Sequence, residues 1–295
     1  MAFVTRFAPS PTGPLHLGHA YSAMLAYDMA VAEGGTFLLR IEDIDQSRCR
    51  PEWEAQIYDD LQWLGLSWPQ PVLRQSQRQA VYAAALDDLW ARHCLFLCTC
   101  NRRDILQALS APQEGVAAAV GPDGPVYPGT CRDQQTRFAH QPRPDGVLRL
   151  HMDQITAAHA AQQGSSGTFS FQEHGSGPLG ETGAIRFDGQ DLCDHIGDIA
   201  VCRRDMATSY HLSVVLDDAE QGVTDVVRGQ DLFEATKIHV LLQRLMGLPT
   251  PIYHHHRLIR DDQGKRLAKR DDARALSKYR AEGATPADIR RMVGL

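Results

Sequence analysis

The feature that most constrains the fold of this 295-residue chain is the separation between two segments that carry phosphate-binding side chains. The first, FAPSPTGPLHLGH, occupies residues 7–19, and the second, the basic segment KRLAKR, occupies residues 265–270. Histidine, lysine and arginine side chains all donate hydrogen bonds to phosphate oxygens. A fold in which both segments serve one site must bring the beginning and the end of the chain together. We therefore expect them to converge on a single nucleotide.

The first segment has the pattern of a strand, a loop and a helix. Residues 3–7 are a short apolar run, prolines and a glycine break the chain after it, and apolar residues then recur at helical spacing. His16 and His19 share one face of the first helical turn, where unpaired backbone N–H groups and the helix dipole favour a phosphate. Gly18 leaves room for a ribose or an adenine against the backbone. Taken alone, a His-x-Gly-His string is more often a pair of ordinary histidines.

The whole segment at residues 7–19 resembles the HIGH motif of the class I aminoacyl-tRNA synthetases. Its lead-in, APSPTG, resembles the glutamyl and glutaminyl branch of that family. The string RIEDID at residues 40–45, followed by Arg48, resembles the next signature of the branch. The resemblance therefore extends over several separate segments of the first 50 residues.

The basic segment at residues 265–270 resembles the mobile KMSKS loop of the same family. Lys269 stands at the second lysine, whereas Arg266 replaces the first lysine and Ala268 replaces the serine. An isolated basic hexapeptide is usually a solvated loop. However, two of the four lysines of this arginine-rich chain lie here, which favours a need for a compact, mobile charge on a phosphate. The two departures are expected to affect the rate and loop closure more than the type of reaction.

The resemblance implies an enzyme that activates L-glutamate with ATP and Mg²⁺. The substrate carboxylate is already ionised, so its attack on the α-phosphorus needs positioning and charge stabilisation rather than a protein base. The resemblance assigns catalysis to His16, His19 and Lys269, and ATP binding to these three residues and Gly18. It assigns glutamate binding to Arg6, Phe7, Ala8, Pro9, Ser10, Glu42, Tyr210 and Arg228.

A glutamate pocket needs guanidinium groups for two carboxylates and an acid for the ammonium group. By resemblance, Glu42 meets the ammonium group, and Arg6, Arg228 and the Tyr210 hydroxyl meet the carboxylates. Structural roles are also open for two of these residues. Glu42 can form an ion pair with Arg40 at a sheet edge, and Tyr210 can be a core residue.

Cysteine spacing gives a candidate metal site. Cys98 and Cys100 are separated by one residue, and Cys131 follows in the string YPGTC. Three thiolates can surround tetrahedral Zn²⁺ at ~2.3 Å, although buried inert thiols explain three cysteines equally well. The resemblance strengthens the metal hypothesis and adds Tyr127, because glutamyl-type synthetases carry a tyrosine and a further cysteine here. We therefore expect one structural zinc ion bound by Cys98, Cys100, Tyr127 and Cys131.

Strands and helices alternate along the chain, which predicts an α/β fold with a parallel sheet. We expect strands at residues 36–41, 211–216 and 223–227, a helix from Pro51, a helix begun by a capping box at residues 76–79, a helix over 232–246 that ends at Gly247, and a last helix opened by Thr285 and Pro286. Between about residues 95 and 190 the periodicity fades, and the Gly-rich stretches 108–126 and 162–183 favour loops.

These patterns, with the resemblance, predict a class I synthetase Rossmann-type parallel sheet that is split by an inserted zinc-containing subdomain and followed by a short α-helical C-terminal segment. The expected division is the first half of the catalytic domain at residues 1–95, the inserted zinc and acceptor-binding subdomain at 96–190, the second half at 191–250, and the KMSKS-type loop with the terminal helices at 251–295.

The net charge of −6 is unusual for a protein that binds nucleic acid. Residues 257–295 hold 11 basic and 6 acidic residues, a net charge of +5, which leaves 19 basic and 30 acidic residues, a net charge of −11, for the rest. A tRNA contact is therefore expected to be local and salt dependent, although a solvated helical face explains this charge equally well. With neither a signal peptide nor an apolar stretch of ~18 residues, we expect a cytoplasmic monomer without membrane contact.

Only 25 residues follow Arg270, fewer than the anticodon-binding domains of glutamyl or glutaminyl synthetases require. The chain therefore resembles the stand-alone catalytic cores of this branch. That resemblance implies glutamate activation without tRNA, followed by transfer to the queuosine base in the anticodon of tRNA(Asp). One alternative is a minimal glutamyl-tRNA synthetase that charges a tRNA 3′ end. The other is an inactive tRNA-binding paralogue, which the departures at Arg266 and Ala268 favour.

Overall fold

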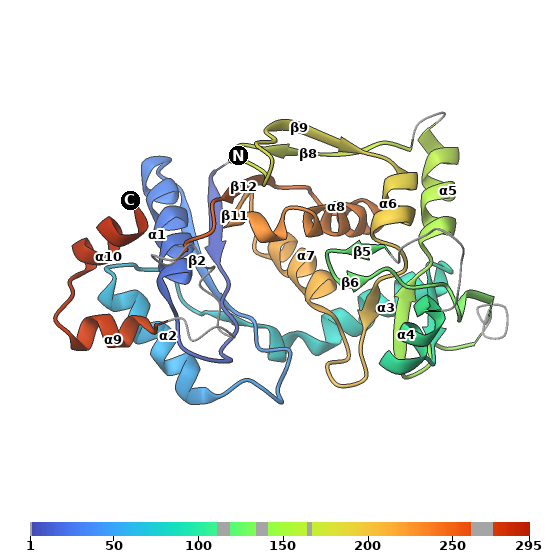
Figure 1. The fold of residues 1–295 in the computed structure, drawn as a ribbon, viewed down its shortest axis with the longest axis horizontal. Helices are drawn as coiled ribbons and strands as arrows, with labels where there is room; N and C mark the ends of the chain where they lie inside the picture. The colour runs from blue at the N-terminus through green and yellow to red at the C-terminus, as the bar shows by residue number, and fades with distance from the viewer. Residues whose placement is uncertain (1, 111–118, 134–140, 164–166, 261–273) are drawn as a thin grey trace.

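The computed structural model describes residues 2–110, 119–133, 141–163, 167–260 and 274–295, and a largely parallel sheet runs through it (Figure 1). Two groups of strands form this sheet. The first group is entirely parallel and has the order β1 (Val4–Phe7), β2 (Thr36–Ile41) and β3 (Leu73–Arg74). The second group is parallel except for its last strand and has the order β11 (Asp225–Gly229), β12 (Ile252–His256), β8 (Phe169–Glu173) and β9 (Gly183–Phe187).

The two groups meet where β11 begins beside β1. The backbone N–H of Thr224 donates to the Val4 carbonyl at 2.9 Å, and the Val4 N–H donates to Thr224 Oγ1 at 2.9 Å. The carboxyl ends of the parallel strands consequently lie at one edge. In open α/β sheets this edge is where ligands bind.

Helices from both ends of the chain cover the first group of strands. Helix α1 (Leu17–Ala32) connects β1 to β2, and α2 (Pro51–Trp63) follows β2. The last helices, α9 (Leu276–Ala281) and α10 (Pro286–Val293), lie beside α1 and α2 in Figure 1. Arg290 of α10 forms a bidentate ion pair with Asp28 of α1, at 2.6 and 2.9 Å, so the two ends of the chain are packed together.

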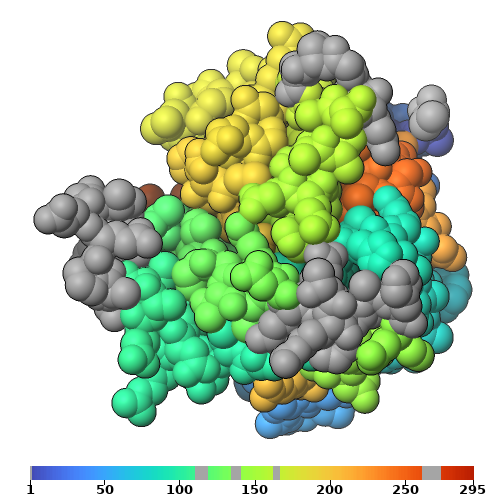
Figure 2. All heavy atoms as spheres, turned by 90° about the vertical axis from the view of Figure 1, so that its right-hand side faces the viewer, coloured from blue at the N-terminus to red at the C-terminus, as the bar shows by residue number. Residues whose placement is uncertain are grey.

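The middle of the chain builds the other end of the molecule. An antiparallel sheet has the order β10 (Ala200–Cys202), β7 (Val147–Leu150) and β4 (Leu95–Cys98), and a hairpin joins β5 (Val120–Gly121) to β6 (Gly124–Pro125). Three helices accompany them, namely α4 (Arg102–Ser110), α5 (Met152–Gln163) and α6 (Gly189–His195). Figure 2 shows that residues from this part form most of the face at this end. The part is not one unbroken insertion, because β8 and β9 return to the central sheet.

Several predicted elements are confirmed, because local signals determine them. Strand β2 has the expected bounds, and α2 begins at Pro51. Helix α8 (Ala235–Met246) ends at Gly247, which adopts the left-handed conformation with φ 66°. Thr285 caps α10 through a reciprocal pair of hydrogen bonds with Asp288. No helix in the described ranges is long and apolar enough to cross a membrane.

Three predictions of secondary structure are wrong. Residues 211–216 belong to helix α7 (Tyr210–Glu220), which is buried on nearly every side and therefore shows no polar face in its sequence. The predicted capping box fails because Ser76 donates its hydroxyl to Asp43 at 2.6 Å, and α3 (Gln79–Ala91) begins after the short 3-10 helix η1 (Gln75–Arg78). The stretch 162–183 is not only loop, since it contains β8.

Candidate functional site

A pocket of about 360 Å³ opens at the carboxyl ends of β1, β2, β11 and β12. The predicted site residues that line it are Arg6, Phe7, Ala8, His16, Gly18, His19, Glu42, Tyr210 and Arg228. Pro9 and Ser10 line a second pocket of about 490 Å³. The two pockets share a wall made of Phe7, Ala8, His19, Glu42 and Tyr210. The fold thus brings together predicted residues from four separate parts of the sequence.

His16 and His19 form the start of helix α1 and stack on each other, with ring centroids 3.8 Å apart. Nδ1 of His16 accepts a hydrogen bond from the Gly18 N–H at 3.1 Å, and Nδ1 of His19 accepts one from the His16 N–H at 3.2 Å. In a neutral imidazole whose Nδ1 is an acceptor, the proton lies on Nε2. The proton of each neutral ring therefore lies on Nε2, and both rings line the pocket. The backbone N–H groups of His16 and Gly18 are therefore paired, so these two are not among the unpaired donors expected at this helix start.

The conformation of the His16 side chain requires a glycine at position 18. A Cβ atom at this position would lie 3.0 Å from Cε1 and 3.2 Å from Nδ1 of His16, which is closer than ordinary van der Waals contact. The missing side chain lets the imidazole turn back over the first helical turn and cap it. Gly18 therefore contributes to the site by shaping its neighbour as well as by leaving space.

The end of the chain reaches the same pocket. Lys269 belongs to residues 261–273, which lie outside the described residues. On one side of that stretch, Leu258 and Ile259 line the pocket together with the histidines. On the other side, the Leu276 N–H donates to the Leu15 carbonyl at 2.8 Å. The described residues that flank the basic segment therefore both lie beside the histidine segment.

A buried charge cluster lies beneath the pocket. Asp218 of helix α7 accepts hydrogen bonds from Arg6, at 2.9 and 3.2 Å, and from Arg40, at 2.6 Å. Arg40 also donates to Glu42 at 3.0 Å. The Arg40–Glu42 ion pair is therefore present. It is buried and does not lie at a sheet edge, because β2 lies between β1 and β3. Burial raises the pKa of Glu42, and the two arginines only partly offset this effect.

The pKa of Asp218 moves in the opposite direction. Burial alone would raise it, but the charges of Arg6 and Arg40 outweigh burial and lower the pKa. Asp218 therefore stays ionised and orients both guanidinium groups. Sequence reasoning did not single out this residue, although two consecutive aspartates at 217 and 218 inside an apolar run are a signal for buried partners.

Tyr210 has both of the roles that the sequence left open. Its ring packs against the main hydrophobic core, and the residue also lines both pockets. Burial, followed by the charge of Glu42, raises the pKa of the phenol. The hydroxyl therefore remains protonated and can donate a hydrogen bond to an anionic group.

Arg228 at the end of β11 differs from Arg6 and Arg40, because its hydrogen-bond partners carry no carboxylate. It donates to His239 Nδ1 at 2.9 Å, to His255 Nε2 at 3.1 Å and to Thr236 Oγ1. Neither histidine was predicted from sequence. His239 lies in helix α8 and His255 in the run of three histidines that ends β12, and neither belongs to a recognised motif. Arg228 is 6% exposed, and its exposed part faces the pocket.

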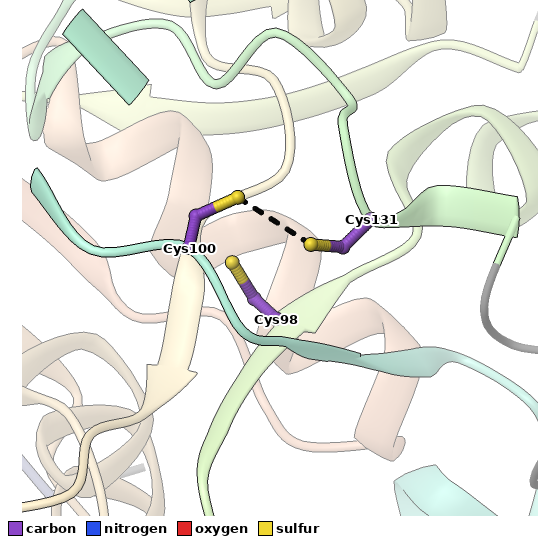
Figure 3. Close-up of side chains that lie close together, drawn as sticks. All are labelled: Cys98, Cys100 and Cys131. Carbon is purple, nitrogen blue, oxygen red and sulfur yellow. Dashed lines mark hydrogen bonds between the residues drawn. The ribbon is translucent and has the colours of Figure 1, made fainter. Parts of the chain in front are cut away.

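The three predicted cysteine ligands lie together away from this pocket (Figure 3). The sulfur atoms of Cys98, Cys100 and Cys131 are all within 4.8 Å of one another, and those of Cys100 and Cys131 are 3.4 Å apart. The Tyr127 hydroxyl lies 3.5 Å from the sulfur atoms of both Cys98 and Cys100. Around a tetrahedral zinc ion, sulfur atoms are ~3.8 Å apart and an oxygen ligand lies ~3.5 Å from each sulfur. These donors therefore fit a zinc ion.

The protonation of the four groups differs. Burial, followed by hydrogen bonds with the cysteines, raises the pKa of Tyr127 far above its usual value. Burial also acts on Cys131, but hydrogen bonds from Tyr127 and Thr99 outweigh it and lower the thiol pKa to about 6. Burial raises the pKa of Cys100 to about 11. Cys131 is therefore the thiol that the fold makes easiest to ionise, and Tyr127 becomes a strong ligand only if it loses its proton.

Comparison with known proteins agrees with this geometry. The family model for the catalytic domain of class I (E and Q) tRNA synthetases matches residues 2–295. A Glutamyl-Q tRNA(Asp) synthetase from Rhodobacter capsulatus is 61% identical over 292 residues, which cover 99% of this chain and 100% of the relative. A protein of the same name from Thiobacillus denitrificans is 40% identical over 97% of this chain and 83% of the relative.

Solved structures are similar in fold. A glutamate tRNA ligase from Elizabethkingia meningosepticum, in complex with its amino acid, has a TM-score of 0.73 and 25% identity. The similarity covers 100% of this chain but 61% of that ligase, so the chain spans less than two thirds of its length. A methionyl-tRNA synthetase from Mycobacterium tuberculosis, at 10% identity and a TM-score of 0.57, shares the fold alone.

Proposed function

Since the chain belongs to the family of class I glutamyl- and glutaminyl-tRNA synthetase catalytic domains, we propose that it is a ligase that activates L-glutamate with ATP and transfers it to queuosine in tRNA(Asp). One observation carries the proposal. A histidine pair at the start of α1, together with an acid and two arginines from the ends of three strands, lines a single pocket, in a chain 61% identical to a glutamyl-Q tRNA(Asp) synthetase.

The ATP phosphates bind at the start of helix α1. The Nε2–H groups of His16 and His19 donate to phosphate oxygens and stabilise the charge that develops on the transferring phosphorus. Mg²⁺ accompanies ATP as part of the substrate. Lys269 supplies a further charge to the phosphates, and this role is supported by the position of the flanking residues Ile259 and Leu276 beside the helix start.

Glutamate lies deeper in the pocket, next to the buried charges. Glu42 accepts a hydrogen bond from the substrate ammonium group, and the positive charge of that group offsets the cost of burying the Glu42 carboxylate. Arg6 uses Nε and Nη2 for Asp218 among the described residues, so Nη1 is the donor that it offers to a carboxylate. Arg228 and the Tyr210 hydroxyl serve the remaining carboxylate oxygens. The backbone of residues 7–10 forms the wall along which the substrate lies.

A zinc ion held by Cys98, Cys100, Cys131 and, when ionised, Tyr127 has a structural role. Its ligands join the end of β4 to the segment that contains residues 127–131. None of them lines the substrate pocket. The ion would therefore stabilise the middle part of the molecule without taking part in the reaction.

The decisive experiment measures activation and transfer separately. We expect glutamate-dependent exchange between pyrophosphate and ATP in the absence of tRNA. Labelled glutamate should then enter tRNA(Asp) that contains queuosine and not tRNA(Asp) that lacks it. Lys269→Ala should lower the exchange rate ~10²–10³-fold, as expected for the loss of one group that stabilises transition-state charge.

Three results would contradict the proposal. Equal labelling of both tRNA forms would show that queuosine is not the acceptor. Loss of labelling when the terminal adenosine of the tRNA is removed would identify a minimal glutamyl-tRNA synthetase, because only that enzyme uses the 3′ end. An absence of exchange under all conditions would identify an inactive binding protein.

A further inference from the structure

The buried arginines of the pocket fall into two electrostatic classes. Arg6 and Arg40 share the carboxylates of Asp218 and Glu42, so two positive and two negative charges balance. Arg228 lies in the same pocket, but within the described part of the chain no carboxylate forms an ion pair with it. A buried guanidinium without a carboxylate partner is uncommon, because charges taken out of water need compensation.

Uncharged groups hold the Arg228 guanidinium in place. His239 Nδ1, His255 Nε2 and Thr236 Oγ1 accept hydrogen bonds from its three nitrogens. The ring of Tyr253 lies under it, 5.0 Å from the guanidinium carbon. The geometry of the side chain is therefore fixed without loss of its charge.

The hydrogen bonds determine the proton positions on both histidines. Arginine is only a donor, so His239 Nδ1 and His255 Nε2 must be acceptors. The opposite nitrogens then carry the protons. His239 Nε2 donates to His211 Nδ1 at 3.1 Å, and His255 Nδ1 donates to Glu173 at 2.5 Å.

Burial keeps these two imidazoles neutral. Burial, followed by the charge of Arg228, lowers the pKa of His239 well below its usual value. Burial also lowers the pKa of His255, and the hydrogen bond to Glu173 only partly offsets this. Both rings therefore remain acceptors toward Arg228 at neutral pH.

Glu173 shows that a carboxylate near Arg228 is kept at a distance. It is 1% exposed and accepts from Nδ1 and the backbone N–H of His255 and from the backbone N–H of Gly175. The His255 ring thus stands between this carboxylate and the guanidinium. A direct ion pair with Glu173 would neutralise the charge of Arg228. The intervening imidazole of His255 prevents this ion pair.

We infer that His239, His255 and Thr236 are positioning residues that fix Arg228 with uncharged acceptors, so that its charge is reserved for one carboxylate of the substrate. This inference rests on the proposed function, and it adds a source of specificity. The pocket should select glutamate over analogues in which that carboxylate is an amide, because the amide leaves a buried cation uncompensated.

Matched pairs of variants test this inference. His239→Asp and His239→Asn have nearly the same shape, but only the first places a carboxylate against Arg228. We expect His239→Asp to raise KM for glutamate ~10–100-fold in the exchange reaction, with KM for ATP unchanged. His239→Asn should stay within ~3-fold of the wild type, because its amide oxygen is a neutral acceptor. The pair Thr236→Asp and Thr236→Asn applies the same test at another nitrogen of the guanidinium.

A ratio of substrates keeps the test valid if a variant folds poorly. The preference for glutamate over glutamine and over isoglutamine, expressed as ratios of kcat/KM, does not depend on the fraction of active enzyme. We expect one of the two ratios to fall ~10-fold or more in the Asp variants and to be retained in the Asn variants. Equal KM values and equal ratios in the Asp and Asn variants would overturn the inference. A wild-type enzyme without glutamate-dependent exchange would instead refute the proposed function.

Discussion

Arg40 and Arg228 are both buried arginines, yet their partners give them different uses. Arg40 is fully buried and binds Asp218 and Glu42, so it holds the charge cluster together. Arg228 binds neutral groups and keeps its charge for the pocket. At the scale of the residue, the function of a side chain therefore depends on the charge of its partners more than on its own chemistry. The same reasoning applies to acids, as Asp60 shows.

Asp60 of helix α2 is 1% exposed, and neither carboxylate oxygen has a hydrogen-bond partner of good geometry in the described structure. Burial, followed by the charge of Asp59, raises its pKa to about 6. The folded state therefore holds a proton that the unfolded state releases near pH 4. Between about pH 4 and pH 6 the unfolded form is ionised while the folded form keeps its proton, so stability is lost over this range as the pH rises.

We predict that Asp60→Asn increases the free energy of unfolding by about 1–3 kcal/mol at pH 8 and by about half as much at pH 5. Urea unfolding of both proteins at the two pH values measures this difference. Glu52→Gln, which changes an exposed acid on the same helix, serves as the control and should show no comparable gain at pH 8. A gain of the same size at pH 5 and pH 8 would disprove the proposed ionisation.

At the scale of the element, the start of helix α1 combines two tasks. The hydrogen bonds of His16 and His19 satisfy backbone N–H groups that a helix start otherwise leaves unpaired, while both rings line the pocket. Histidine is not among the preferred N-cap residues, so its use here indicates that the ring serves a second purpose. Substitution by residues that cap well but lack an imidazole can separate the two tasks.

We predict that His16→Asn retains the cap and the stability of the wild type but lowers the pyrophosphate exchange rate ~10²–10³-fold. His16→Ala should lose the same activity and in addition about 1 kcal/mol of unfolding stability. Thermal or urea unfolding and the exchange assay measure the two effects. If His16→Asn were as active as the wild type, the ring would be only a cap.

At the scale of the whole molecule, the middle part depends on contacts between distant cysteines. We predict that the purified protein contains one zinc ion per chain and that Cys131→Ser loses it. Cys193→Ser changes a half-buried cysteine outside the cluster, and it should retain the ion. Elemental analysis measures the metal, and limited proteolysis should detect faster cleavage between residues 98 and 131 in Cys131→Ser. Equal zinc content in both variants would exclude the three-cysteine site.

The sequence alone identified the short-range features of this protein. The strand at residues 36–41, the caps of the helices around residues 247 and 285, and the spacing of the cysteines each depend on neighbouring residues, whose propensities and hydrogen bonds act locally. The family resemblance added the residues of the pocket, and the fold brings all the described ones to one edge of the sheet. Local patterns therefore predicted these elements, and the resemblance predicted the reaction class.

The tertiary structure decided which groups neutralise one another. Arg6 and Asp218 are 212 residues apart, and Glu173 and His255 are 82 apart, so no local pattern could pair them. Burial on all sides likewise hid the helical character of α7 from its sequence. Charge balance and burial are properties of the packed molecule, because each depends on what the rest of the chain places nearby. For this reason the neutral surroundings of Arg228 became visible only in the fold.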